Sequence, residues 1–108
     1  MSEIYVTIRN EIGVAMTSIE GEPVKVFIRR EGLIYDEQPV SLRFAYAYFH
    51  NFPLGKCTVV ARHPLLNPIE AEKDVDLLAG KALRIKYVYL EAERQLLRIE
   101  AIVERLDT

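Results

Sequence analysis

The stretch 49–59 constrains the fold of this chain more than any other. It joins an aromatic strand end to an alternating strand through a Pro/Gly turn, and it reads Phe49-His50-Asn51-Phe52-Pro53-Leu54-Gly55-Lys56-Cys57-Thr58-Val59. Phe52 precedes a proline and is therefore biased to extended geometry, while Gly55 can take the positive φ that a tight return requires. The Asn51 side chain can close such a turn. The stretch predicts an antiparallel hairpin between residues 42–49 and 57–62.

Alternation along this hairpin divides its side chains between two faces. The apolar face holds Ala47, Phe49, Cys57, Val59 and Ala61. The other face holds Leu42, Phe44, Tyr46, Tyr48, His50, Thr58, Val60 and Arg62. We expect the first set in the core, with Cys57 buried and chemically quiet. His63 precedes a proline at the end of a strand, so we expect it on a surface loop, where its replacement changes stability by under about 0.5 kcal/mol.

The rest of the chain alternates short apolar segments with turn residues. Ile4, Val6 and Ile8 recur with the period of a half-buried strand. Further strands are expected over 24–29, 69–78 and 82–90, and a weaker one over 14–19. Residues 33–39 are irregular, and 63–68 form a loop because two prolines lack the amide that a sheet requires. Turn residues recur roughly every ten positions, which is typical of a β-sandwich or barrel.

The C-terminal segment 92–106 allows two interpretations. As a helix it gathers its apolar residues on one side. However, Arg94 and Arg98 then place like charges four residues apart, and no capping residue precedes the run. As a strand it directs Leu97, Ile99, Ala101 and Val103 to one face, with 91–95 as a loop. The strand is preferred because a sandwich needs a partner for 82–90, and the amphipathic helix remains the alternative.

Length and charge narrow the range of functions. The 108 residues, half of them apolar, predict one domain over 1–108. Fourteen Lys and Arg residues face sixteen Asp and Glu residues without a basic block, so nucleic acid is not an expected partner. No apolar run is long enough to cross a membrane, the start resembles no secretion signal, and a single cysteine forms no internal disulfide. We expect a soluble, cytoplasmic protein.

A family resemblance rests on the Pro/Gly stretch and its flanks. The stretch Ala47-x-Phe49-x-Asn51-Phe52-Pro53-Leu54-Gly55-Lys56-Cys57-Thr58-Val59-Val60-Ala61 resembles the F-x-F-x-N-L-P-P-G-x-Y-x-V-x-A segment of transthyretin-like, carboxypeptidase-regulatory and collagen-adhesin B-type sandwiches. Residues 75–83 are similar to a later step of those domains, while Cys57 replaces their usual tyrosine. The resemblance implies one all-β, antiparallel sandwich of about seven strands. It also implies a mostly non-catalytic module that supports, spaces or binds.

One branch of that superfamily, resembling transthyretin itself, hydrolyses a purine-pathway intermediate and ends in a Tyr-Arg-Gly-Ser tail. This chain ends Glu104-Arg105-Leu106-Asp107-Thr108, which counts against the hydrolase.

The reactive side chains do not form a recognisable catalytic or metal motif. Alternation sends Cys57 away from His50, and no Cys or His pair has zinc-ligand spacing. Carboxylates at 70, 72, 74 and 76 could bind calcium, but a charged edge strand explains them better. We therefore assign no catalytic residue, no metal and no cofactor.

The aromatic row is the most informative surface feature. One face of this strand is apolar, and the opposite face carries Phe44, Tyr46, Tyr48 and His50. We therefore expect both faces to be shielded from solvent by other groups. A C-terminal helix, another chain or a ligand could provide that cover. The sequence favours a non-enzymatic module that self-associates or binds a protein partner, with interaction residues Phe44, Tyr46, Tyr48, His50 and Arg62. The alternative is a ligand-binding or hydrolase-type domain with Tyr46 and Tyr48 around a small molecule and His50 as its polar group.

Overall fold

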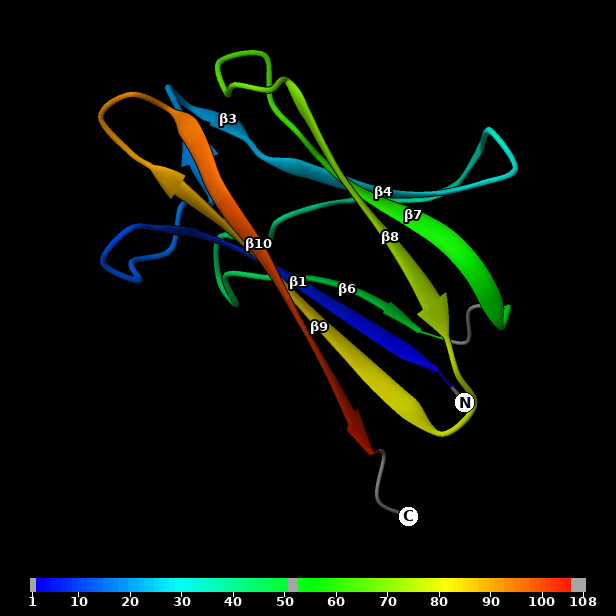
Figure 1. Cartoon of the computed structure of the whole chain (residues 1–108). Coiled ribbons are helices and arrows are strands. Elements are labelled where there is room, and N and C mark those ends of the chain that lie inside the picture. Colours follow the sequence, from blue (N-terminus) through cyan, green and yellow to red (C-terminus); the bar gives the residue numbers. More distant parts are fainter. Residues whose placement is uncertain (1, 51–52, 106–108) are drawn as a thin grey trace.

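Two β-sheets enclose the core of this protein. The computed structural model describes residues 2–50 and 53–105, and its ten strands form two four-stranded sheets and a two-stranded ribbon. Figure 1 shows the two large sheets lying across one another, with β4, β7 and β8 in one layer and β1, β6, β9 and β10 in the other. The described residues contain no helix. The predicted all-β sandwich architecture is therefore confirmed.

The first sheet has the strand order β10-β9-β1-β6. Its members are β1 (Glu3–Asn10), β6 (Ala47–His50), β9 (Lys81–Leu90) and β10 (Gln95–Arg105). β1 pairs antiparallel with β6 and parallel with β9, and β10 pairs antiparallel with β9. The prediction of a purely antiparallel sandwich is therefore wrong. β1 and β9 are neighbouring strands that run in the same direction, although they lie far apart in the chain.

The second sheet has the order β5-β4-β7-β8, and all of its pairs are antiparallel. It contains β4 (Lys25–Arg30), β5 (Leu33–Pro39), β7 (Gly55–Arg62) and β8 (Glu70–Leu77). Short strands β2 (Ser18–Ile19) and β3 (Glu22–Pro23) form the ribbon.

The two large sheets together hold eight strands where about seven were expected. Strand β5 was not predicted from the sequence, because a register shift between Ile28 and Arg29 breaks the alternation of the β4–β5 pair.

The core forms between the inner faces of the two sheets. Alternation in β1 buries Ile4, Val6 and Ile8 completely, as predicted. The face expected in the core is also buried and comprises Ala47, Phe49, Cys57, Val59 and Ala61. The sheets are joined by a hydrogen bond in which the Tyr87 hydroxyl donates to the Val59 carbonyl at 2.7 Å.

The predicted hairpin between 42–49 and 57–62 is wrong. β6 pairs with β1 in the first sheet, whereas β7 pairs with β4 and β8 in the second. The Pro/Gly stretch therefore carries the chain from one sheet to the other, and its Asn51 and Phe52 lie outside the described residues. Inward and outward positions were still predicted correctly for the core residues, because strands of both sheets bury alternate side chains in the same core.

The C-terminal helix predicted as an alternative over 92–106 is also wrong. Residues 95–105 form β10, which runs the length of β9. Glu100 and Glu104, like charges that a helix would also place four residues apart, find partners across the strands: Glu104 accepts from Arg84, and Glu100 lies beside Lys86. Within residues 2–50 and 53–105, therefore, no helix covers the aromatic row, so a C-terminal helix does not explain how that row is covered.

His63 is buried, contrary to its expected place on a surface loop. Only 1% of the residue is exposed, and its Nδ1 accepts a hydrogen bond from the Leu65 amide at 3.0 Å. The loop is held inward because the Asn67 amide donates to the Arg94 carbonyl in the β9–β10 turn. The prolines of this segment do exclude a strand, as predicted, but the loop packs against its neighbours instead of projecting into solvent.

Candidate interaction face

Five rings gather on the outer face of the first sheet, which is turned away from the second sheet. Tyr5 and Tyr48 are cross-strand partners of β1 and β6, and their ring centroids lie 4.8 Å apart. Tyr46 meets the Tyr5 ring edge-on at 5.4 Å, Phe44 stacks on Tyr46 at 5.9 Å, and His50 stacks on Tyr48 at 5.4 Å. We call these residues, Tyr5, Phe44, Tyr46, Tyr48 and His50, the aromatic cluster. Phe44 is 61% exposed, so the cluster presents apolar surface to solvent.

Glu3 fixes the orientation of two of these rings. Its carboxylate accepts hydrogen bonds from the Tyr48 hydroxyl at 2.8 Å and the Tyr5 hydroxyl at 3.3 Å. Partial burial among the neighbouring rings and the bond to Glu3 raise the pKa of Tyr48 to about 12. Partial burial, followed by the charge of Glu3 and the hydrogen bond to it, raises the pKa of Tyr5. Both hydroxyls therefore remain neutral donors, and the two rings are held before any partner arrives.

Arg84 connects the aromatic cluster to a charged area on β9 and β10. Its guanidinium carbon lies 4.5 Å from the centre of the Tyr5 ring, in cation–π geometry. Its Nε donates to Glu104 at 2.9 Å, and this hydrogen bond raises the pKa of Arg84. The guanidinium is consequently a fixed cation at the border between rings and charges.

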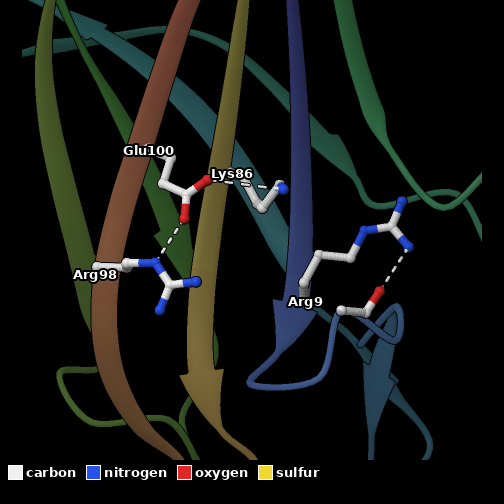
Figure 2. A network of polar contacts seen from close by, with 5 residues as sticks. Arg9, Lys86, Arg98 and Glu100 are labelled. Atoms are coloured by element: carbon white, nitrogen blue, oxygen red, sulfur yellow. Dashed lines mark hydrogen bonds and ion pairs between the residues drawn. The ribbon is translucent and has the colours of Figure 1, made fainter.

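Figure 2 shows further polar contacts on β10, β9 and β1 of the same sheet. Glu100 on β10 accepts a hydrogen bond from Arg98 and lies 3.7 Å from the Lys86 Nζ of β9. The Arg98 bond, followed by the charges of Arg98 and Lys86, lowers the pKa of Glu100. Arg9 on β1 donates to the Gly13 carbonyl at 3.3 Å and has no carboxylate partner in the described part of the chain. Positive charge thus exceeds negative charge on this area.

A groove of about 380 Å³ runs along the same area. Its walls include Tyr5, Thr7, Arg9, Arg84, Lys86 and Ile102. We call it the cation groove. It combines apolar side chains with three cations and one carboxylate, Glu100. This composition suits a ligand or side chain that carries a negative charge beside apolar surface.

The structure brings together four of the five residues predicted to interact. Phe44, Tyr46, Tyr48 and His50 lie in one cluster, as described above. Arg62 lies elsewhere, exposed on β7 of the second sheet, with its Nε 3.7 Å from Glu70. Its predicted place depended on the hairpin between 42–49 and 57–62, which does not form.

Sequence reasoning missed Glu3, Tyr5 and Arg84. Alternation already placed Glu3 and Tyr5 on the outer side of the first strand, but nothing in the sequence paired that strand with β6.

Cys57 lies beside a different groove, of about 780 Å³, at one end of β4, β7 and β8. The residue is 5% exposed, which confirms its predicted burial, and that burial raises the pKa of its thiol. The nearby Arg30 is occupied by the carbonyls of Pro53 at 2.7 Å and Leu54 at 3.2 Å. His50 lies on the outer face of the other sheet, so the two residues diverge as predicted.

The alternating carboxylates of β8 lie on an edge strand of the second sheet. Glu72 is 2.6 Å from the Arg29 Nη2, Glu70 approaches Arg62, and Asp74 accepts from the Thr58 hydroxyl. Within residues 2–50 and 53–105, no group of three or more His, Cys, Asp or Glu side chains could hold a metal ion. These contacts favour the interpretation of the alternating carboxylates as a charged edge strand.

Comparison with known proteins gives no family assignment: no family model, curated protein or solved structure matches this chain. In the described part of the chain, no helix is long and apolar enough to span a lipid bilayer.

Proposed function

We propose that this chain is a non-enzymatic interaction module, a transthyretin-like sandwich in kind, that docks onto another protein surface through the aromatic cluster. A second copy of the chain is its simplest partner. The observation that carries the proposal is the contiguous set of five rings on a sheet face that points away from the core.

The physical case rests on exposure and preorganisation. Soluble monomers rarely keep large apolar patches uncovered, and tyrosine is favoured at interfaces because it joins an apolar ring to a polar tip. Here Glu3 holds the hydroxyls of Tyr5 and Tyr48, so less side-chain freedom is lost when a partner binds. The rings are arranged in advance as a docking surface.

The transthyretin-like part of the proposal has separate support. Two four-stranded sheets share one core. Cys57, which stands where the family has tyrosine, takes an inward position in β7.

A ligand-binding or hydrolase-type role is the second candidate. The cation groove beside Tyr5 favours it, since the volume suits a small molecule. However, the residues lining this groove include neither His50 nor Tyr46 and Tyr48, around which that role was predicted. His50 stacks on Tyr48 on the exposed surface instead. The geometry therefore supports docking better than catalysis.

Sedimentation velocity over a range of concentrations tests the proposed function. The wild-type chain should associate as its concentration rises, whereas a Tyr46→Ser/Tyr48→Ser variant should remain monomeric and keep its β-sheet circular dichroism. A Leu65→Ser/Leu78→Ser variant is the matched control, because it removes exposed apolar side chains elsewhere. A wild-type chain that is monomeric at millimolar concentration, or a tyrosine variant that associates equally well, would contradict self-association through this cluster.

A further inference from the structure

The β4–β5 hairpin exposes an apolar and acidic tip. Leu33, Ile34 and Tyr35 are consecutive residues with exposed fractions of 74%, 61% and 56%. They belong to edge strand β5, and Figure 1 shows the turn between β4 and β5 projecting away from both sheets. Three neighbouring exposed apolar residues at a projecting turn indicate a surface that inserts into another one. We call residues 31–37 the hairpin tip.

The turn itself carries a carboxylate in an unfavourable backbone conformation. Arg30 and Leu33 are paired, so Glu31 and Gly32 form a two-residue turn, with φ values of 53° and 79°. Asparagine, aspartate or glycine is favoured at the first of these positions, whereas glutamate is strained there. With Asp36 and Glu37, Glu31 makes the tip acidic as well as apolar.

The cation groove has the complementary character. Its lining holds three cations, Arg9, Arg84 and Lys86, against one carboxylate, Glu100. The apolar wall is also exposed, since Ile102 is 57% exposed beside the Tyr5 ring. The groove is therefore net positive, whereas the whole chain has a formal net charge of −2.

We infer that the hairpin tip of one copy docks into the cation groove of a second copy. This inference rests on the proposed function, because the groove is bordered by the Tyr5 ring, which Tyr46 and Tyr48 contact and hold in place. The Glu31 carboxylate meets Arg9, the cation that has no carboxylate partner among residues 2–50 and 53–105 of its own chain. The side chains of Leu33 and Ile34 cover Ile102 and the edge of the Tyr5 ring, so both exposed apolar surfaces leave water together.

The geometry of this contact determines the form of the assembly. Tip and groove are different surfaces, so the contact is heterologous and each copy can both donate a tip and accept one. The result is a chain of copies or a closed ring. One hairpin tip buries less than the roughly 1,000 Å² of a stable interface, so association is weak. Salt weakens it further because charges on exposed surfaces are screened.

Complementation between two variants tests the inference in the full chain. Ile34→Arg places a cation on the tip, and Arg9→Ser removes a cation from the groove. Each variant alone should sediment as a monomer at concentrations where the wild type associates. An equimolar mixture should give a dimer and nothing larger, because only one combination of tip and groove is intact. Ile69→Arg and Lys25→Ser are matched controls at exposed positions outside both surfaces, and they should behave as the wild type does.

The outcomes separate this inference from the proposed function. Unchanged circular dichroism and melting temperature must show that each variant is folded. If the mixture stays monomeric, or if Ile34→Arg associates as the wild type does, the inference is wrong. If the inference fails in this way but the Tyr46→Ser/Tyr48→Ser variant is monomeric, docking through the aromatic cluster is still supported. The aromatic clusters of two copies then contact each other directly. When none of these substitutions changes association, the proposed function is wrong as well.

Discussion

At the scale of single residues, burial does not always follow residue type. His63 would be an ordinary surface histidine by its sequence neighbours, yet the Leu65 amide and the inward course of its loop enclose it. Tyr87 and Tyr89 are fully buried in β9, whereas Tyr46 and Tyr48 lie on the outer surface. The difference arises from which face of which strand each residue occupies.

Replacing His63 is therefore expected to destabilise the fold. His63→Ala removes a buried ring and leaves both a cavity and an unpaired Leu65 amide, which should lower the free energy of unfolding by roughly 2–4 kcal/mol. His50→Ala, at the exposed histidine, should change it by under about 0.5 kcal/mol. Urea denaturation of the two variants checks this difference, and equal midpoints would show that His63 is not packed as described.

Buried tyrosines should make the fold sensitive to alkali. Burial raises the pKa of Tyr89 to about 12 and raises that of Tyr87 as well. Tyrosine in the unfolded chain titrates near 10, so the folded state binds more protons between about pH 10 and 12. Stability should thus be complete below about pH 10 and fall by roughly 2–3 kcal/mol for Tyr89 as pH rises to about 12.

Urea denaturation at stepped alkaline pH measures this loss, with Tyr89→Phe as the control. The Tyr89 hydroxyl is buried and has no hydrogen-bond partner in the described part of the chain, so its removal should be nearly neutral at pH 7. The variant should also lose less stability in alkali. A wild type whose stability is constant up to about pH 12 would contradict the burial of these rings.

At the scale of strands, the sequence predicted which side of a strand faces the core better than it predicted which strands pair. Alternation in β1 correctly separated buried from half-buried positions, because the period of a strand is a local property. In β7 it identified the core face correctly, but Val60 on the opposite face is buried as well. Pairing is not local: the Pro/Gly stretch could reverse the chain within one sheet or carry it to the other, and both satisfy the same pattern. β5 was missed for a related reason, since its shifted register and exposed apolar residues hide the strand period.

The crossing between the sheets depends on Gly55. This residue has φ of +110°, and a Cβ placed on it would meet only the Arg30 Nη2, at 3.9 Å. The expected penalty therefore comes from backbone strain and not from a clash. Gly55→Val should lower the free energy of unfolding by roughly 1–3 kcal/mol. Thermal melting checks it, and a melting temperature equal to that of the wild type would mean that the backbone can relax away from positive φ.

The register of β7 predicts a quiet thiol. Cys57 faces the core between Val59 and the sheet crossing, and burial raises its pKa, so little thiolate is present at neutral pH. A disulfide reagent should label the native chain far more slowly than the chain unfolded in urea. Equal labelling rates would place Cys57 on the surface and shift β7 by one residue.

At the scale of the whole molecule, the outer face of the first sheet is the candidate site, and only part of it was visible in the sequence. The row of Phe44, Tyr46, Tyr48 and His50 was predicted from alternation alone. Tyr5, Glu3 and the cation groove required the pairing of β1 with β6 and with β9, which residues distant in sequence determine. Arg62 was misplaced for the same reason.

The most direct test of the central claim is a dilution series of the wild-type chain by NMR with isotope-labelled tyrosine rings. Two of the six tyrosines, Tyr87 and Tyr89, are buried and serve as internal controls. Docking through the aromatic cluster predicts that the ring signals of Tyr5, Tyr46 and Tyr48 shift with concentration while those of Tyr87 and Tyr89 do not. Ring signals that are all independent of concentration up to the millimolar range, or shifts confined to tyrosines outside the cluster, would contradict it.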